Sequence, residues 1–405
     1  MDTTYDKALM PPAAAWSAVA SMALCVSVLI ASEFMPVSLL TPIAGDLGLT
    51  EGQAGQAISI SGLFAVITSL TVARLTRGID RKLVLDGFSW MLIISGALVA
   101  FAPNYAALML GRALLGVAIG GFWSMSTAVV MRLLPVADVP RGLGMLNAGN
   151  AIAATIAAPL GSYLGDIIGW RGAFFLVIPL ALLALVAQRM TLPTLAAPRR
   201  EAVGGNVFSL LLRPQVALGM ASILLLFMGQ FALFTYLRPF LEQVAGFSVP
   251  ALSLVLLLMG LAGVAGTSCV GLVLRSRLYA IVIIIPVVMA VIAGLLMAFG
   301  MTPLPVGILL IVWGFVGTAA PVAWGTWLSR ALSDDAEAGG GLQVATIQLA
   351  ITIGAAAGGA LFDRAGWAST FALAAFLLLG SALFAIAAAI NARGDNKQQS
   401  LKSVR

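Results

Sequence analysis

The chain has 405 residues, of which 61% are hydrophobic and only 9% are charged, and its formal net charge is +6. Soluble domains carry roughly 25% charged residues, so this composition excludes an ordinary soluble protein and indicates a membrane protein. The sequence has no histidine and no cluster of cysteines or carboxylates at metal-ligand spacing. We therefore expect neither a conventional metal site nor a cofactor.

Apolar runs of about 20 residues, the length that crosses a ~30 Å hydrocarbon core as a helix, recur along the chain. Barrel strands would be about ten residues long and would alternate in polarity, so these runs predict helices. We predict an all-α membrane protein with twelve transmembrane helices. The predicted spans are 16–43, 53–73, 83–102, 107–131, 142–164, 172–188, 215–240, 249–273, 279–299, 304–328, 342–362 and 368–390.

Lysine and arginine indicate the orientation of these spans. The first run is too long for a signal peptide, so we interpret it as a retained span. Basic residues gather on the even-numbered connections and on both tails, as they do in cytoplasmic segments. The exceptions among the 22 lysines and arginines are Arg112, Arg171, Arg238 and Arg364. Both termini are thus predicted to be cytoplasmic, and topology explains the positive charge without nucleic acid.

The longest polar connection divides the chain into two halves of six spans each. We predict an N-terminal half over 1–187, a cytoplasmic linker over 188–214, a C-terminal half over 215–392 and a cytoplasmic tail over 393–405. A linker of this kind is typical of transporters that move one half against the other.

The two halves share a local repeat. A shift of 197 residues places GSYLGDIIGWRGAFFL over GGALFDRAGWASTFAL, and it matches Asp166 with Asp363 and Trp170 with Trp367. A shift that preserves chain direction indicates a parallel repeat, as in the major facilitator fold, where substrate lies between the halves near the membrane midplane. The predicted mechanism of such a body is alternating access.

Glu33 lies within the first span, where a carboxylate is costly unless it faces a cavity or a partner. At ~1.5 Å rise per residue, Glu33 and Arg112 of the fourth span fall at similar depth in the outer half. Pro36 leaves the Ser32 carbonyl without a helical partner and helps to bend the helix there. Burial favours a neutral carboxyl and a nearby arginine favours the ionised form, so alternation between them would couple protons to transport. The alternatives are a static structural pair or a glutamate at the lipid–water edge.

Several other residues inside the spans are candidates to line a substrate path. Trp123 would stack on a flat substrate, although core packing is an alternative role. Amides inside spans either bond neighbouring helices or line a wet path. Because Arg112 is a single cation, the set favours a small neutral polar substrate over a dicarboxylate or phosphate. The other candidates are Asn147, Asn150, Gln230, Phe234, Tyr236 and Gln348.

Three segments resemble motifs of major facilitator transporters. The segment ARLTRGIDRKLVL is similar to the loop signature GxLaDrxGrkxxL, which implies a gating role for Arg81, and it departs from the signature at Ala73, Arg77 and Asp80. Asp80 is a further gating candidate. Arg77 stands where that signature has an aspartate, so either Asp80 or Asp86 would replace the missing carboxylate. The segment GRALLGVAIGG resembles the Arg-centred motif, in which the arginine matched by Arg112 is implicated in proton transfer. The segment AAPLGSYLG, around Pro159, looks like the antiporter motif, which implies a hinge or seal, and Pro36 is the other hinge candidate.

More narrowly, nearly all of the chain resembles bacterial purine ribonucleoside efflux pumps of the drug:proton antiporter group. The segments that carry the resemblance are SEFMPVSLLTPIAGDLG, GGFWSMS, MRLLP, APLGSYLGDIIGWR, GQFALFTYLRP and LQVATIQLA. This resemblance implies proton-coupled export of nucleosides such as inosine and guanosine across the bacterial inner membrane. It also implies contact with protons and membrane lipid.

Two alternatives remain open at this point. The same machine would serve for export of sugars or of several drugs, because the fold does not fix the substrate. A membrane-embedded enzyme would need a cluster of nucleophile, base or metal ligands, and a sensor usually has an attached soluble domain. The sequence indicates neither, so we predict a transporter that is not an enzyme. We expect a monomer, because six plus six spans complete a pathway without a partner.

Overall fold

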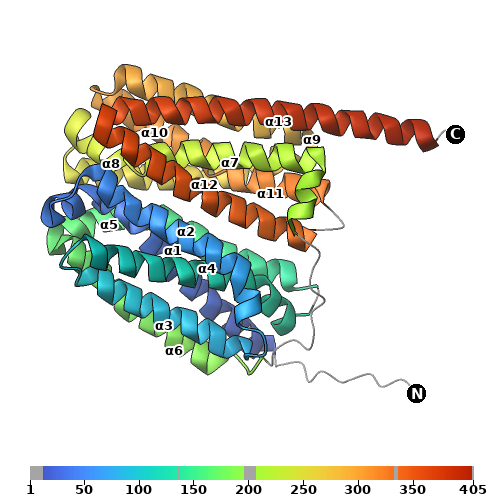
Figure 1. Ribbon diagram of the computed structural model, residues 1–405, viewed down its shortest axis with the longest axis horizontal. Coiled ribbons are helices and arrows are strands. Elements are labelled where there is room, and N and C mark those ends of the chain that lie inside the picture. Colours follow the sequence, from blue (N-terminus) through green and yellow to red (C-terminus); the bar gives the residue numbers. More distant parts are fainter. Residues whose placement is uncertain (1–11, 136, 196–206, 333–335, 404–405) are drawn as a thin grey trace.

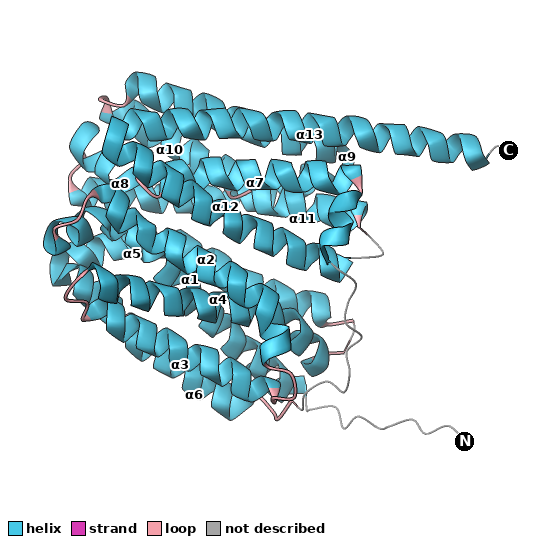
Figure 2. Cartoon of the chain, viewed as in Figure 1, coloured by secondary structure: helices cyan, strands magenta, loops and turns pink. Residues whose placement is uncertain are grey.

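The computed structural model describes residues 12–135, 137–195, 207–332 and 336–403, and these fold into helices without a β-strand (Figure 2). The elements are α1 (Pro12–Leu47), α2 (Glu51–Leu75), α3 (Arg81–Ala100), α4 (Tyr105–Leu133), α5 (Val139–Phe175), α6 (Val177–Thr191), the 3-10 helix η1 (Val207–Leu212), α7 (Pro214–Phe234), α8 (Leu237–Pro239), the π-helical turn η2 (Phe240–Val244), α9 (Val249–Phe299), α10 (Pro303–Gly317), α11 (Ala320–Ala331), α12 (Ala336–Ala365) and α13 (Trp367–Ser403). The predicted all-α class is confirmed.

Eleven helical segments among the described residues are long and apolar enough to cross a membrane. The longest, Arg141–Thr191, has 51 residues, which as a straight helix would measure ~76 Å and far exceed a ~30 Å hydrocarbon core. Gly169, with φ 73°, interrupts it between the predicted spans 142–164 and 172–188. A similar interruption at Arg277 separates 249–273 from 279–299 within α9. The predicted spans are therefore recovered once these breaks are taken into account.

Short polar side chains fix where several helices begin. At the start of α2, Thr50 and Gln53 form a reciprocal capping box, which satisfies two backbone N–H groups that have no partner within the helix. The Asn104 side chain accepts from the Ala107 nitrogen at the start of α4. These caps fix the residue at which each apolar helix begins.

The helices form two bundles, each with its own apolar core. Helices α1–α6 form the lower bundle in Figure 1, and α7–α13 form the upper one. One core consists of residues from the first bundle together with Tyr236, and the other consists of second-bundle residues together with Val37, Ile58 and Ala158. Side chains that cross in this way join the two bundles. The boundaries 1–187, 188–214, 215–392 and 393–405 remain predictions, and residues 196–206 and 404–405 lie outside the described part.

The repeat seen in the sequence has a matching backbone conformation. Gly169 has φ 73° and Gly366 has φ 75°, and a tryptophan follows each glycine. Non-glycine residues rarely adopt positive φ, because the Cβ atom clashes with the backbone there. Both copies thus reverse the chain with the same glycine turn, which supports a parallel duplication of six helices.

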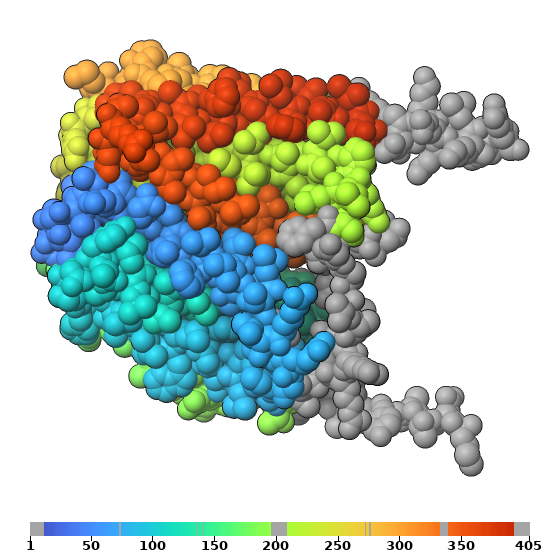
Figure 3. Space-filling view, in the orientation of Figure 1, coloured from blue at the N-terminus to red at the C-terminus, as the bar shows by residue number. Residues whose placement is uncertain are grey.

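The two bundles converge at one end. Helix α1 begins and α13 ends on the right of Figure 1, whereas the turn after α1 and the junctions of α5 with α6 and of α12 with α13 lie on the left. We call this left end the distal end. There the residues of α2 meet those of α12, as Figure 3 also shows, and the ribbons of the two bundles separate toward the right. The distal end is the end at which the molecule is closed.

Candidate functional site

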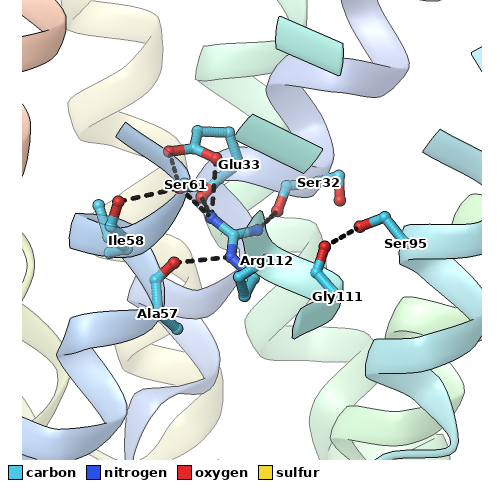
Figure 4. Close-up of polar contacts among 8 residues, drawn as sticks. All are labelled: Ser32, Glu33, Ala57, Ile58, Ser61, Ser95, Gly111 and Arg112. Atoms are coloured by element: carbon cyan, nitrogen blue, oxygen red, sulfur yellow. Dashed lines mark hydrogen bonds and ion pairs between the residues drawn. The ribbon is translucent and has the colours of Figure 1, made fainter. Parts of the chain in front are cut away.

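Glu33 and Arg112 form a buried ion pair inside the first bundle. The Arg112 Nη2 atom lies 2.7 Å from Glu33 Oε2, and the side chains are 0% and 9% exposed respectively (Figure 4). Separating such a pair would leave a charge buried without a partner, which costs about 3–5 kcal/mol. The structure thus brings together the two residues that the sequence singled out, although their role in proton coupling remains a prediction.

Arg112 also binds backbone carbonyls on two helices. Its Nη1 donates to the Ser32 carbonyl at 2.8 Å, and its Nε donates to the Ala57 carbonyl at 2.9 Å. The helical partner of the Ser32 carbonyl would be the nitrogen of Pro36, which has no hydrogen. Arg112 therefore occupies the acceptor that this proline frees in α1, and it ties α4 to both α1 and α2.

Ser61 of α2 completes the site and did not appear among the sequence candidates. Its hydroxyl lies 2.8 Å from Glu33 Oε1, and Arg112 Nη2 donates to it at 3.1 Å (Figure 4). Helix α4 approaches α2 closely enough for this contact because Gly116 and Gly120 carry no side chain. A methyl group on either glycine would overlap the carbonyl of Ser61 or Ala65. Spacing of four residues puts both glycines on one face of α4.

Phe34, the neighbour of Glu33 on α1, contacts aromatic rings of the second bundle. Its ring centroid lies 5.9 Å from that of Phe231, nearly parallel to it, and 6.4 Å from that of Phe234 in an edge-to-face arrangement. Rings at these separations stack favourably with one another. Phe234 was among the residues predicted to line a substrate path, whereas Phe34 and Phe231 were not, because their apolar character alone does not distinguish them from other residues of the spans.

Gln230 lies one turn before Phe234 on α7, and therefore on the same face. Its Oε1 atom is buried and has no hydrogen-bond partner among the described residues, and the same holds for Thr235 Oγ1. An unpaired buried acceptor costs about 1–3 kcal/mol, so both groups are suited to receive a donor from elsewhere. The aromatic cluster of Phe34, Phe231 and Phe234 joins the two bundles, whereas the amide of the half-buried Gln230 lies near Gly317 of α10.

The distal end is closed by a carboxylate from α12. Asp363 Oδ2 accepts from the Thr50 hydroxyl at 2.6 Å, and its Oδ1 accepts from the Gly52 nitrogen at 2.9 Å. Asp363 thus joins the cap of α2 from the opposite bundle, at the helix terminus that favours negative charge. A methyl group on Gly52 would overlap both Asp363 and the Gly359 carbonyl, so this contact requires glycine at position 52.

Arg238 of α8 makes a second connection at this end. It donates from Nη1 to the Ser38 carbonyl of α1, and its guanidinium also pairs with Glu242 at 2.8 Å. The helical partner of the Ser38 carbonyl would be the nitrogen of Pro42, which lacks a hydrogen. Nearby, Gln243 donates to Glu51 at 3.2 Å. These polar contacts between the bundles therefore cluster at the distal end.

The fold and this arrangement can be compared with known proteins. The model of the Major Facilitator Superfamily matches residues 22–343, which is most of the chain. The chain belongs to the Major Facilitator Superfamily. The family expected from the sequence motifs is confirmed, and the chain is accordingly a multi-pass membrane protein of a transporter family.

Relatives within the Major Facilitator Superfamily cover nearly the whole chain. The transcription regulatory protein OpdE of Pseudomonas aeruginosa is 53% identical over 374 residues, which is 92% of this chain and 93% of that protein. The purine ribonucleoside efflux pump NepI of Salmonella paratyphi B is 43% identical over 369 residues, which is 91% of this chain and 92% of that protein. The more specific resemblance to purine ribonucleoside efflux pumps is thus confirmed at the level of sequence.

A solved structure of the same superfamily shares the fold. It is that of a bacterial homologue of the human lysosomal transporter Spinster, described as inward-facing and unoccupied. The TM-score is 0.69 at 15% sequence identity, and the match covers 94% of this chain and 96% of that one. At this identity the likeness bears on the fold alone.

The loop that resembles the superfamily signature holds the end of α6. Asp80 caps α3 by accepting from the Lys82 nitrogen at 2.8 Å, and it also accepts from the Leu195 nitrogen at 3.1 Å. Arg81 donates to the Thr76 hydroxyl at 2.8 Å. In this structure, therefore, Asp80 and Arg81 bind backbone and hydroxyl groups around the turn.

Asp86 is the carboxylate of this region that forms an ion pair. Its Oδ2 lies 3.2 Å from Arg189 Nε of α6. Lys82 strengthens the same connection by donating to the carbonyls of Arg189 and Leu192 at 2.9 and 2.7 Å. These contacts stay within the first bundle, and the question of which aspartate replaces the missing signature carboxylate remains a matter of prediction.

The remaining candidates lie in different environments. Trp123 is half-buried and packs against the core of the first bundle. Asn147 is exposed and donates to the Leu143 carbonyl of its own helix at 3.0 Å, and Asn150 is half-buried one turn later. Pro159 is buried within α5. In the described part of the chain, no hydrogen bond, ion pair or ring contact joins any of these four residues to Glu33 or Arg112.

Tyr236 and Gln348 lie where α12 packs against α2. The Tyr236 hydroxyl donates to the Ala355 carbonyl at 2.8 Å, and its ring stacks on Phe362 with centroids 5.3 Å apart. A methyl group on Gly55 of α2 would overlap this ring. Gln348 is half-buried, and its carbonyl lies beside Gly62 of α2. In the closed arrangement Tyr236 is a packing residue between the bundles.

Proposed function

We propose that this protein exports purine ribonucleosides across the bacterial inner membrane in exchange for protons, by alternating access between two six-helix halves. The observation that carries the proposal is the 43% identity, over 91% of the chain, to a purine ribonucleoside efflux pump. The buried Glu33–Arg112 pair adds a group able to carry the proton. In this proposal the distal end faces outward, and both termini are cytoplasmic.

The proposed cycle starts from the pair at the centre of the first bundle. With the distal end open, a proton entering from outside would neutralise Glu33 and weaken its attraction to Arg112. With the distal end closed, loss of that proton to the cytoplasm would restore the ion pair. A group that binds a proton in the distal-open state and releases it in the distal-closed state couples the proton gradient to the change of conformation. The proton shifts the equilibrium between the two states because it binds one of them more tightly than the other.

The proposed substrate site lies beside the rings of Phe34, Phe231 and Phe234, and Gln230 lies on the same face of α7 as Phe234. A purine base offers a flat aromatic face and hydrogen-bond donors on its edge. Stacking of a base on an aromatic side chain is worth about 1–3 kcal/mol. Gln230 Oε1, which has no partner among the described residues, would accept from the base or the ribose. This site places the substrate next to Glu33.

The proposal is tested by transport in inverted membrane vesicles. Labelled inosine should accumulate when the vesicle interior is made acidic, and should equilibrate without a pH gradient. Vesicles that lack the protein serve as the control. If arabinose or a cationic dye accumulates and inosine and guanosine do not, the same machine exports a different substrate. If an imposed pH gradient has no effect on any substrate, the coupling to protons is wrong.

A second candidate function rests on the relative from Pseudomonas aeruginosa, which is named a transcription regulatory protein and is 53% identical. A transporter alters transcription indirectly when its substrate is an inducer or co-repressor, because transport sets the internal concentration of that effector. A regulatory effect would therefore accompany transport rather than replace it.

These two functions are separated by one genetic comparison. Transcript levels are measured in cells that carry the wild type, a deletion, or Glu33→Gln. If regulation follows transport, the Glu33→Gln strain should resemble the deletion strain. If regulation is normal although transport is lost, the protein signals by a route independent of export.

A further inference from the structure

We propose that Ser61 is a positioning residue of the coupling site and that its hydroxyl hydrogen reports the charge of Glu33. The hydroxyl donates to Glu33 when the carboxyl group is ionised, and to the Ile58 carbonyl when it is protonated. This inference rests on the proposed function, in which Glu33 carries the proton. Ser61 would thus stabilise the ionised carboxylate in one half of the cycle and release it in the other.

The geometry gives Ser61 two acceptors for one hydrogen. Its Oγ lies 2.8 Å from Glu33 Oε1 and 2.9 Å from the Ile58 carbonyl oxygen (Figure 4). A serine hydroxyl donates one hydrogen bond and accepts up to two. Both acceptors are within bonding distance in the same arrangement of atoms, so only the hydrogen has to turn when the donor changes partner.

The charge of Glu33 determines which acceptor is preferred. A hydrogen bond to an ionised group is roughly twice as strong as one between neutral groups, so the carboxylate wins when it is charged. Once the carboxyl is protonated, the two acceptors are both neutral and the Ile58 carbonyl becomes competitive. Ser61 therefore stabilises the ionised form of Glu33 in particular, without leaving its hydroxyl unpaired in either form.

Arg112 is fixed independently of this change. It donates to the Ser32 and Ala57 carbonyls, and its Nη2 reaches both Glu33 Oε2 and the oxygen of Ser61. When Ser61 turns its hydrogen toward Ile58, its oxygen can still accept from Arg112. The guanidinium thus keeps acceptors in both states, and this avoids the cost of a buried cation without a partner.

The other charged groups on the elements that pack against α1 are engaged further along the helix. Arg238 of α8 bonds to Ser38 and pairs with Glu242, and Arg171 of α5 pairs with Asp46 near the distal end of α1. Among the described residues, the side-chain hydrogen bonds of α3 and α6 to α1 join uncharged groups: Cys25 lies 3.6 Å from Ser89, and Ser21 accepts from Thr191 at 3.0 Å. Arg112 of α4 is the charged partner of Glu33 itself.

The test compares Ser61→Ala with Ser61→Thr and with a control, Ser95→Ala, all as full-length protein in liposomes. Ser95 donates from a buried hydroxyl to the Gly111 carbonyl at 2.7 Å, next to Arg112 on the opposite side of α4. Ser95→Ala therefore removes a comparable buried hydrogen bond that does not touch Glu33. Gly116 packs on the Ser61 carbonyl, so removal of the side-chain oxygen leaves that backbone contact unchanged.

The first readout is the pH dependence of inosine exchange. Loss of the Ser61 bond removes stabilisation from the ionised form, so Ser61→Ala should move the midpoint upward by about one pH unit. Ser61→Thr, which keeps the hydroxyl, and Ser95→Ala should keep the midpoint of the wild type. A Ser61→Ala midpoint equal to that of the wild type, or a rate reduced equally at every pH, would overturn the inference.

The second readout does not depend on the substrate. The infrared band of the protonated Glu33 carboxyl is identified by its loss in Glu33→Gln and is then titrated with pH. In Ser61→Ala this band should appear at higher pH than in the wild type. If inosine is not transported but the band still shifts, the proposed substrate is wrong and the role of Ser61 stands. If the band titrates identically in both proteins, the role of Ser61 is wrong whatever the substrate.

Discussion

Arg238 donates a hydrogen bond to the carbonyl of Ser38. In a regular helix this carbonyl would accept from the N–H of residue 42, but Pro42 has no N–H. Arg112 does the same for Ser32, whose helical partner would be Pro36. Each proline inside α1 thus frees one carbonyl, and an arginine occupies it. One arginine comes from the same bundle as α1 and the other from the opposite bundle, so the two bonds have different fates when the bundles separate.

Glu33→Gln should uncouple transport from the proton gradient. Glutamine keeps the size of the side chain and still accepts from Arg112, but it cannot bind and release a proton. We expect exchange of internal for external inosine to persist, while accumulation driven by a pH gradient disappears. Both are measured in the same reconstituted vesicles. Full pH-driven accumulation by this variant would show that Glu33 is not the coupling group.

Arg112→Lys should impair both transport and stability. A lysine ammonium cannot reproduce the planar fork that reaches Ser32, Ala57 and Glu33 together. Carbonyls buried without a donor cost about 1–3 kcal/mol each, so unfolding in detergent should occur at a lower temperature. Arg77→Lys, at an exposed position, serves as the matched control. A variant with wild-type melting and wild-type transport would contradict this account of the site.

Arg238→Ala should loosen the distal end. The change removes the bond to Ser38 and leaves Glu242 without its cation. We expect a larger population in which the distal ends are apart. Spin labels on cysteines at positions 45 and 364, both exposed and in opposite bundles, would report longer distances by pulsed electron resonance after Cys25 and Cys269 are replaced. An unchanged distance distribution would mean that Arg238 does not hold the distal end closed.

Gly52→Ala should hinder closure more severely than the loss of any single hydrogen bond. The added methyl group would meet the Asp363 carboxylate and the Gly359 carbonyl, so α2 and α12 could not pack as they do here. We expect transport to fall at least tenfold, with the same shift toward long label distances. Gly45→Ala is the control, because a methyl group there meets no neighbouring atom within 4 Å. Equal transport by both variants would rule out this packing requirement.

Phe34→Ala should weaken binding of the nucleoside. If the base stacks on this ring, its loss costs about 1–3 kcal/mol, which corresponds to a KM raised by about 5-fold to 150-fold. Phe34→Tyr keeps the aromatic face and should retain a KM near that of the wild type. A lower maximal rate with unchanged KM in Phe34→Ala would instead indicate that the ring acts in packing of the two bundles against each other.

The sequence was sufficient to predict features governed by local rules. Hydrophobic length predicted the spans, and the cost of a charge in hydrocarbon identified Glu33 and Arg112 as a pair. The chemistry of proline predicted that the Ser32 carbonyl would lack a partner. In each case the physical rule depends on the chain near one residue, so it can be applied before any tertiary contact is known.

Features that depend on the rotation and pairing of helices could not be predicted. Ser61 is one of many serines in the spans, and only the approach of α4 through Gly116 and Gly120 brings its hydroxyl to Glu33. Tyr236 resembled a ligand-binding residue, yet in this state it packs against Gly55 across the bundle interface. Asp80 was expected to act in gating, and in this structure it caps α3. Their environments follow from contacts between distant segments.

The two arginine bonds along α1 differ in permanence. When the bundles rock apart at the distal end, Ser32 keeps its donor because Arg112 moves with the same bundle, whereas Ser38 loses Arg238. The five residues between Pro36 and Pro42 would then form the least constrained turn of the helix, anchored at one end only. Alternation would thus soften α1 on the distal side of Glu33 in one state and stiffen it in the other, and the rigidity of a single helix would follow the state of the transporter.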